Sequence, residues 1–138
     1  MRIAFGTDER TAVTDSVRAW LTDRGHEVTV VADGEAWPEV GRAVGHAVAE
    51  GDAQRGVVCC WTGTGVSMAA NKVRGVRAAL CTDGATAAGA RRWNDANVLA
   101  MGLRLTSAEV AAEMLEAFLA TAPDATEAGA IARIEPDA

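Results

Sequence analysis

The stretch Val57–Lys72, VVCCWTGTGVSMAANK, decides the architecture that we expect for the whole chain. Its first residues are apolar and β-branched, which is typical of a buried strand in a parallel sheet. The turn over residues 61–65, WTGTG, contains two glycines that permit positive φ and a close backbone approach, and the residues from Val66 onward suit a helix. A strand, a glycine turn and a helix in this order aim several backbone N–H groups at one point, where the helix dipole also favours an anion.

Cys60 ends this strand, and we expect it to face the same crevice as the glycine turn. A helix N-terminus favours the thiolate form of a neighbouring cysteine, which can then act as a base or a nucleophile. A tight turn beside a merely buried cysteine would show the same local pattern, because a glycine turn alone is a weak signal. The other two cysteines, Cys59 and Cys81, are interpreted as small buried residues.

Composition excludes several classes of protein. The 138 residues are 49% hydrophobic and carry a net charge of −6, and they contain no basic cluster of the kind that binds nucleic acid. No apolar run is long enough to cross a bilayer, and no charged-then-apolar leader precedes the first strand pattern. We therefore expect a cytoplasmic protein with neither membrane nor nucleic-acid partners. The three cysteines lack the spacing of a zinc site or a disulfide framework.

Strand and helix patterns alternate along the chain without a linker or a repeat. The strands are predicted at residues 2–6, 26–31, 56–60, 76–81 and 97–101. The helices are predicted to begin near residues 11, 37, 66, 85 and 107, with a last short helix over 124–134. This alternation predicts one α/β domain over residues 1–138, with a parallel sheet covered on both faces. Ligands of such sheets bind beyond the carboxyl ends of the strands, which here carry Asp8, Glu9, Cys60, residues 61–65, Asp83 and residues 102–104.

Five stretches together resemble one known family: IAFGTD at 3–8, WPE at 37–39, CWTGTGVSMAANK at 60–72, VRAALCTD at 76–83 and WNDANVLAMGLR at 93–104. The chain resembles the ribose-5-phosphate isomerase B family, which includes galactose-6-phosphate isomerase. The resemblance implies a Rossmann-like three-layer αβα sandwich with a five-stranded parallel sheet, and a homodimer or dimer of dimers with a shared active site. The tail over residues 120–138 could pack on a partner subunit. The implied chemistry is aldose–ketose isomerisation of a small sugar or sugar-phosphate-like substrate through an enediol, without metal or organic cofactor.

The resemblance also assigns roles to single residues. Cys60 falls where much of the family has the base that moves a proton between C1 and C2, and Asp8 falls where an acid contacts sugar hydroxyls. A branch of the family uses a glutamate as the base at the position where this chain has Val66, so Cys60 is the only candidate for the base here. Removing a proton next to a carbonyl creates an enediolate, which needs a positioned base and preorganised N–H donors. The other matching positions are the oxyanion-stabilising loop Trp61, Thr62, Gly63, Thr64 and Gly65, with Thr62 counted as catalytic, and the substrate-binding residues Ser67, Asn94 and Arg104.

Several residues depart from the family pattern. Glu9 stands where the family has a histidine that contacts phosphate, and Trp93 stands where it has a histidine that opens the sugar ring. Ala130 replaces the first of two phosphate-clamping arginines, and Arg133 only approximates the second. Trp61 replaces a glycine. These changes favour a substrate other than ribose 5-phosphate, for instance an open-chain tetrose, bound in part by Glu9, Trp61, Trp93 and Arg133.

Each departure also has a structural interpretation. Glu9 could be a solvated residue in the first turn of a helix, and Trp61 and Trp93 could be core or interface aromatics rather than walls of a pocket. Asp8 and Arg104 could be partners of each other. A catalytically silent family member that binds a small molecule or serves as an interaction subunit is therefore the second hypothesis. An enzyme with a nucleophilic cysteine acting on a non-sugar carbonyl is the third.

Apolar residues near the C-terminus favour assembly. The side chains of Leu115, Phe118 and Leu119, with Ile131 and Ile134, offer more apolar surface than a domain of this size is expected to hide. We therefore expect a homodimer or a dimer of dimers. The only two histidines, His26 and His46, are interpreted as structural.

Overall fold

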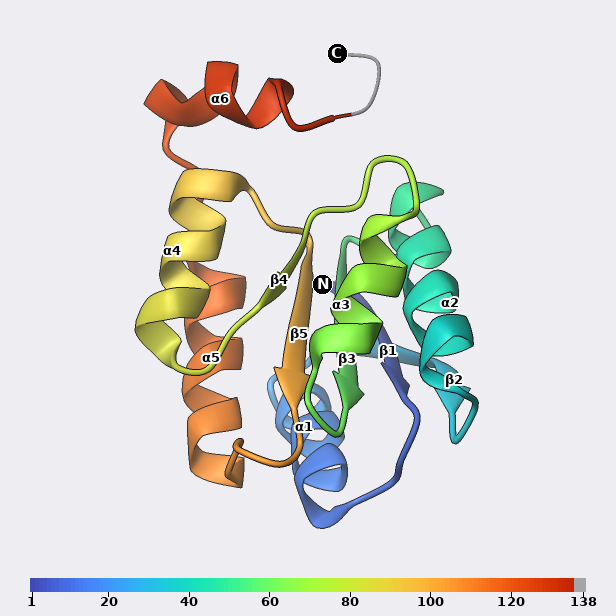
Figure 1. Cartoon of the computed structure of the whole chain (residues 1–138). Helices are drawn as coiled ribbons and strands as arrows, with labels where there is room; N and C mark the ends of the chain where they lie inside the picture. The colour runs from blue at the N-terminus through green and yellow to red at the C-terminus, as the bar shows by residue number, and fades with distance from the viewer. Residues whose placement is uncertain (136–138) are drawn as a thin grey trace.

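The computed structural model describes residues 1–135 and contains a five-stranded parallel sheet between two layers of helices (Figure 1). The strands, in the spatial order β2-β1-β3-β5-β4, are β1 (Arg2–Thr7), β2 (Glu27–Asp33), β3 (Arg55–Cys60), β4 (Ala78–Leu80) and β5 (Val98–Gly102). The helices are α1 (Ala12–Asp23), α2 (Trp37–Ala49), α3 (Thr64–Asn71), α4 (Gly84–Asn94), α5 (Ala108–Ala120), the 3-10 turn η1 (Ala125–Glu127) and α6 (Ala128–Ala132). The predicted three-layer α/β class is confirmed.

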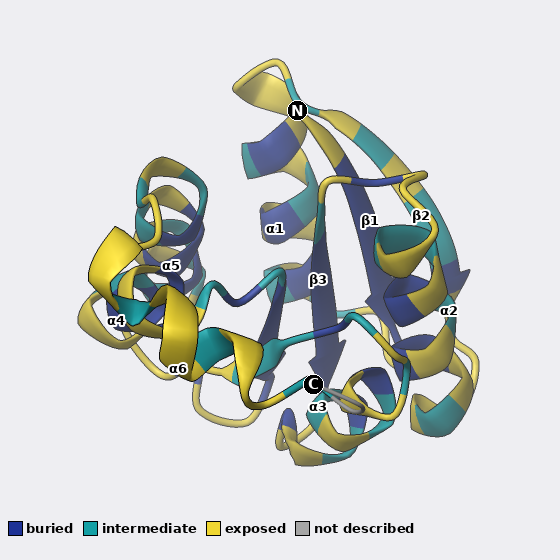
Figure 2. Ribbon diagram, turned by 90° about the horizontal axis from the view of Figure 1, so that it is seen from above, coloured by how far each residue is buried: buried dark blue, intermediate teal, exposed yellow. Residues whose placement is uncertain are grey.

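Two apolar cores lie on opposite faces of the sheet because side chains alternate along each strand. In β3, Val57 and Cys59 point into the core that α1, α4 and α5 cover, whereas Val58 and Cys60 point into the core under α2 and α3. The central strands β1 and β3 are buried along almost their whole length, while α6 at the C-terminal end is largely exposed (Figure 2).

The argument for assembly is wrong for two of its five residues. Leu115 and Phe118 of α5 are fully buried within the chain itself, packed in the core between α5 and the sheet. They therefore offer no surface to a partner. The large apolar side chains that remain exposed lie elsewhere, and they include Trp93 and Ile134. The expected homodimer or dimer of dimers remains a prediction on other grounds.

Several element boundaries differ from the predicted ones. Helix α3 begins at Thr64 instead of Val66, because Gly63 takes the left-handed N-cap position with φ 76°. Strand β4 has only three residues and lies at the edge of the sheet. On its open side the Asn71 side chain accepts from the Ala78 N–H at 2.8 Å and donates to the Ala78 carbonyl at 3.0 Å, so one amide replaces a neighbouring strand there.

The direction of α4 determines where several candidate residues lie. The helix begins at Gly84, where the Asp83 side chain caps it by accepting from the Thr86 N–H, and it runs back against the direction of the strands (Figure 1). Its eleven residues span about 16 Å at 1.5 Å per residue. Asn94 therefore lies at the end of the sheet where β5 begins, opposite to the carboxyl ends. Helix α6 lies beyond that same end, as the short C-terminal helix predicted from the sequence; residues 136–138 of the predicted tail lie outside the described residues.

Candidate active site

The carboxyl ends of β1, β3 and β5 bring a first group of candidate residues together. Cys60 lies opposite Gly102 in the register of the sheet. The Asp8 N–H donates to the Cys59 carbonyl oxygen at 3.3 Å, and the Leu103 N–H donates to the Cys60 carbonyl oxygen at 2.9 Å. These contacts place a carboxyl-bearing turn and a thiol on neighbouring strand ends.

The glycine turn is packed too closely for any other residue at Gly63. A Cβ atom there would lie 2.6 Å from the Leu80 side chain and 2.8 Å from the backbone nitrogen of Gly102, and the positive φ would add strain. No side chain caps α3, so the N–H groups at its start have no partner within the helix and are available to an anion. The hydroxyls of Thr62 and Thr64 lie 2.8 Å apart at the mouth of this turn. Both side chains are exposed.

Two other predicted residues surround this turn. The Ser67 N–H already donates to the Gly63 carbonyl oxygen at 3.2 Å, so only the half-buried Ser67 hydroxyl can contact a ligand. Gly65 lies in the first turn of α3, directly beneath the indole of Trp37. Trp37 was not among the candidates from the sequence, although the WPE stretch and the glycine were both visible there.

The three thiols differ in their surroundings. Cys60 is 5% exposed, and it belongs to the apolar cluster that also contains Val66 at the start of α3. Burial, and then the neighbouring Cys60 and Asp8, raise the pKa of the Cys59 thiol far above its usual range. Burial, and then Asp83, raise the pKa of Cys81 to about 11. The interpretation of Cys59 and Cys81 as buried structural residues is confirmed.

Asp8 carries a buried carboxylate oxygen without a hydrogen-bond partner, its Oδ1. Buried polar atoms are almost always hydrogen-bonded, so this oxygen is available to a donor that a ligand would supply. Burial, and then the negative charge of Glu9, raise the pKa of the Asp8 carboxyl. Asp8 forms no ion pair with Arg104, although both lie in the described part of the chain, so the suggested pairing of these two residues is wrong.

Glu9 and Trp61 lie on the rim of this site. Glu9 is exposed, and its backbone is fixed because the Thr7 hydroxyl donates to the Glu9 carbonyl oxygen at 2.6 Å. Trp61 is 52% exposed, so it is not a core aromatic. It borders a small cavity of about 160 Å³ beside the turn, which is lined mainly by Trp61, Thr62, Leu80, Gly102, Arg104 and Leu105.

A second group of predicted residues lies at the opposite end of the sheet. Trp93 and Asn94 end α4, and Arg133 follows α6; all three are exposed. Trp93 is therefore not a core aromatic either. With Ile134, Trp93 and Asn94 line a groove of about 1090 Å³ that runs along β4 between α3 and α4. A single copy of the chain does not bring this group next to Cys60.

Two features are absent from residues 1–135. No three His, Cys, Asp or Glu side chains lie together there as a candidate metal site. No helix in this part of the chain is long and apolar enough to span a membrane.

The fold and the site together define a class of protein. It is a Rossmann-like α/β protein that carries a thiol, a carboxyl and an uncapped helix start at the carboxyl ends of its strands. The sequence profile described as Ribose/Galactose Isomerase matches residues 3–135. D-erythrulose-4-phosphate isomerase of Pectobacterium atrosepticum is 35% identical over 125 residues, covering 86% of this chain and 82% of the relative. Ribose-5-phosphate isomerase B of Escherichia coli is 37% identical over 123 residues, covering 86% and 83%.

The solved structures agree. Ribose-5-phosphate isomerase B of Clostridium thermocellum superposes with a TM-score of 0.90 at 34% identity, over 97% of this chain and 95% of that one. The chain belongs to the Ribose/Galactose Isomerase family. The resemblance inferred from the sequence is confirmed, and so is the expectation of an aldose–ketose isomerase.

Proposed function

We propose that this chain isomerises an open-chain four-carbon sugar with an anionic group on its last carbon, and that Cys60 is the base. The cysteine thiolate would take the proton from C2 of the aldose, and the electrons of that C–H bond would form the C1–C2 double bond of an enediolate. Returning the proton to C1, while the O2 hydroxyl loses its proton and O1 gains one, would complete the ketose. The reverse sequence of steps converts the ketose into the aldose.

The surroundings of Cys60 support this role. The enediolate oxygen gains stabilisation from N–H groups that already point at one place, and the uncapped start of α3 offers such groups next to the thiol. The Thr62 and Thr64 hydroxyls, 2.8 Å apart, add donors at the same turn. The free Oδ1 of Asp8 would accept a hydrogen bond from a substrate hydroxyl.

Trp93 is the main reason for proposing an open-chain substrate. Trp93 has no group that can protonate a sugar-ring oxygen, whereas the family pattern has a histidine there. Neither histidine of the chain replaces it, because His26 contacts the N-terminal amine at 3.1 Å and His46 lies 3.7 Å from Glu50. A four-carbon sugar phosphorylated on O4 has no free hydroxyl that could close a five-membered ring. It therefore needs no ring-opening acid, and the similar D-erythrulose-4-phosphate isomerase is named for such a substrate.

The complete site in this proposal needs two copies of the chain. Cys60, Asp8 and the glycine turn lie at the carboxyl ends of the strands, and Asn94 and Arg133 lie at the other end. Binding of one substrate by both groups requires the second group to come from a partner subunit. Trp93 and Asn94 line the open groove along β4. We place the contact with a second copy at this groove, so that Asn94 of one copy lies close to Cys60 of the other. A homodimer, alone or paired into a tetramer, satisfies this requirement.

A catalytically silent binding or interaction subunit is the alternative, and Glu9 and Trp93 favour it because they replace family histidines. Turnover separates the two. The purified protein is given D-erythrulose 4-phosphate, and the aldose is followed by proton NMR, with deuterium incorporation from deuterated water at C1 of the ketose and C2 of the aldose as a second readout. Turnover and exchange that both disappear in Cys60→Ala support the proposal. Turnover that survives in Cys60→Ala would contradict the role of Cys60 as the base. The absence of turnover with every tetrose and pentose phosphate would support the silent subunit.

A further inference from the structure

The residue that follows Asn94 has an unusual backbone. Asp95 ends α4 in the left-handed region with φ 48°, and it is the only non-glycine residue with positive φ among residues 1–135. Glycine or asparagine normally fills this position, because a side chain is strained there. An aspartate at this strained position indicates that its carboxylate makes contacts that glycine cannot make.

Two arginines hold that carboxylate. The Arg91 guanidinium donates to Asp95 Oδ1 at 2.7 Å and to the Ala96 carbonyl at 2.6 Å. Its Nε donates to the Thr121 carbonyl at 3.2 Å. Arg91 is only 2% exposed, and a buried charge of this kind is tolerated only when its partners are all in place. The corner after Asn94 is therefore fixed from the side of α4.

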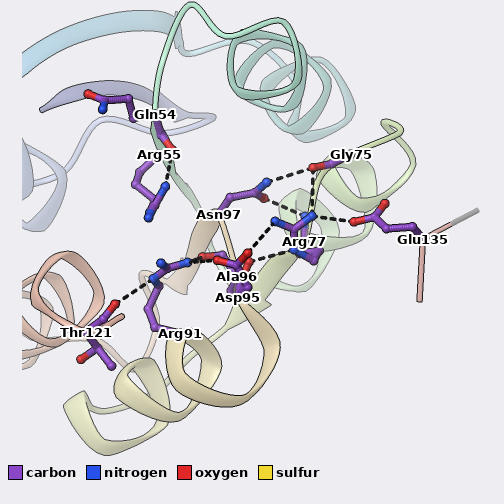
Figure 3. A network of polar contacts seen from close by, with 10 residues as sticks. All are labelled: Gln54, Arg55, Gly75, Arg77, Arg91, Asp95, Ala96, Asn97, Thr121 and Glu135. Atoms are coloured by element: carbon purple, nitrogen blue, oxygen red, sulfur yellow. Dashed lines mark hydrogen bonds and ion pairs between the residues drawn. The ribbon is translucent and has the colours of Figure 1, made fainter. Parts of the chain in front are cut away.

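Arg77 holds the same corner from the loop before β4 (Figure 3). Its Nε donates to the Asp95 carbonyl at 2.8 Å, and one terminal nitrogen lies 3.4 Å from Asp95 Oδ2. The Arg77 backbone N–H donates to the Asn97 side chain at 2.7 Å, and that side chain donates in turn to the Gly75 carbonyl at 2.9 Å.

The same guanidinium reaches the C-terminal segment. The other terminal nitrogen of Arg77 lies 2.5 Å from Glu135 Oε1, two residues after Arg133. One side chain thus connects the residue after Asn94 with the segment that carries Arg133 (Figure 3). Only arginine can do this, because its planar fork presents five donors in several directions at once.

We propose that Arg77 is a positioning residue for the part of the active site that this chain gives to its partner. It orients Asn94 through Asp95 and Arg133 through Glu135, and it touches no substrate itself. This inference rests on the proposed function, because it gives Asn94 and Arg133 their role at a site shared between subunits.

Mixed oligomers test the inference by locating the defect. Chains of Cys60→Ala and Asn94→Ala are first mixed under conditions that exchange subunits, with turnover of D-erythrulose 4-phosphate as the readout. If the site is shared, random pairing restores about one quarter of the wild-type activity, because half of the dimers then contain one intact site of two. No restoration by this pair means that the site is not shared, and both the shared site and the role of Arg77 are then overturned.

Arg77→Met is then mixed with each of those two variants. We expect restoration with Cys60→Ala and none with Asn94→Ala, because Arg77 and Asn94 would damage the same half of the site. Restoration with Asn94→Ala would overturn the positioning role while the shared site stands. Arg42→Met, which removes an exposed arginine of α2 paired only loosely with Glu39 at 3.9 Å, is the matched control and should keep full activity.

Amide hydrogen exchange gives a readout that needs no substrate. Glu135→Gln and Asp95→Asn remove the two contacts of Arg77 one at a time, so the test can still be made if Arg77→Met fails to fold. Glu135→Gln should speed amide exchange in residues 128–135 alone, and Asp95→Asn should speed it in residues 94–97 alone. Arg77→Met, or Arg77→Lys in its place, should speed both. Unchanged exchange in either segment of an Arg77 variant would contradict the link between them.

Discussion

The indole of Trp37 packs against Gly65 and leaves no room for a side chain there. A Cβ atom at Gly65 would lie 2.8 Å from two carbon atoms of the Trp37 ring. Trp37 begins α2 beyond the end of β2, and Gly65 lies in the first turn of α3, so this contact joins two helix starts at the candidate active site. It fixes the backbone whose N–H groups would stabilise the enediolate.

Gly65→Ala should therefore lower both stability and turnover. Overpacking of this kind costs about 1–3 kcal/mol, and the shift of the turn should reduce kcat more than it changes KM. Thermal unfolding and steady-state kinetics measure the two effects. The double variant Trp37→Ala, Gly65→Ala should recover part of the loss because the clash is gone. Additive losses in the double variant would show that Trp37 does not constrain this turn.

Cys60 should react with iodoacetamide at neutral pH faster than the other two thiols. Burial holds the pKa of Cys81 at about 11 and that of Cys59 higher still, so both remain protonated thiols. Cys60 lies at the strand end beside the start of α3. Mass spectrometry of peptides after timed labelling separates the three rates. Equal rates in the folded protein would remove the argument for an activated thiolate.

The fold follows from local sequence patterns, whereas part of the candidate site does not. The alternation of strands and helices predicted all five strands and the layer order, because burial on both faces of a parallel sheet leaves continuous apolar runs. It also predicted which residues end the strands. The positions of Trp93, Asn94 and Arg133 relative to Cys60 depend on the direction of α4 and on a second copy of the chain, and no local pattern encodes either. The packing of Trp37 on Gly65 and the Arg77 contacts likewise depend on distances across the fold.

Asp8 should make stability depend on pH. Burial, and secondly Glu9, raise its pKa in the folded state above the ordinary value of 3.8. The folded state therefore binds more protons than the unfolded state between the two pKa values, and the contribution of Asp8 to stability falls as pH rises through that window. Asp8→Asn should thus raise the melting temperature at pH 7 and lose this advantage below pH 3.8. A gain that is the same at both pH values would mean that the carboxyl charge is not its cause.

Asp8→Asn should at the same time lower turnover. The free Oδ1 is placed to accept from a substrate hydroxyl, and an amide binds such a donor less strongly than a carboxylate does. A variant that gains stability and loses activity identifies a residue kept for function. Asp23→Asn serves as the control, because it removes an exposed carboxylate at the end of α1, away from the candidate site. Full activity in Asp8→Asn would contradict a role in substrate binding.

The purified chain should be a dimer or a tetramer at micromolar concentration. The argument no longer rests on α5, whose Leu115 and Phe118 are buried, but on the open groove beside β4 and on the exposed Trp93 and Ile134 that line it. Light scattering coupled to size exclusion measures the mass. Ile134→Asp should weaken the assembly, because it places a charge in the proposed contact. A monomer with full isomerase activity would contradict the shared site.

Turnover of ribose 5-phosphate should be very slow. Two unit charges 4 Å apart repel by about 1 kcal/mol in bulk water and about 4 kcal/mol at an effective dielectric of 20. Because Glu9 is exposed, its repulsion of a phosphate lies toward the lower of these values. The arginine that Ala130 replaces would have added about 1.5–3 kcal/mol as a charge-assisted hydrogen bond. Together these losses weaken the binding of any sugar phosphate, D-erythrulose 4-phosphate included, by roughly two to four decades. Ribose 5-phosphate must also have its ring opened, and Trp93 removes the acid for that step, so its turnover should fall well below that of the open-chain substrate.

The triple variant Glu9→His, Trp93→His, Ala130→Arg should therefore gain activity on ribose 5-phosphate. The imidazole at position 93 would restore an acid for ring opening, and the other two changes would restore attraction for the phosphate. Comparing kcat/KM for ribose 5-phosphate and D-erythrulose 4-phosphate, before and after the change, measures the shift in preference. Glu9→Gln alone should improve KM for ribose 5-phosphate only slightly, since it removes repulsion without adding a donor of positive charge. An unmodified enzyme that already isomerises ribose 5-phosphate with an ordinary kcat/KM would refute this prediction, and would mean that Arg104 and Arg133 bind the phosphate without the residues that this chain has lost.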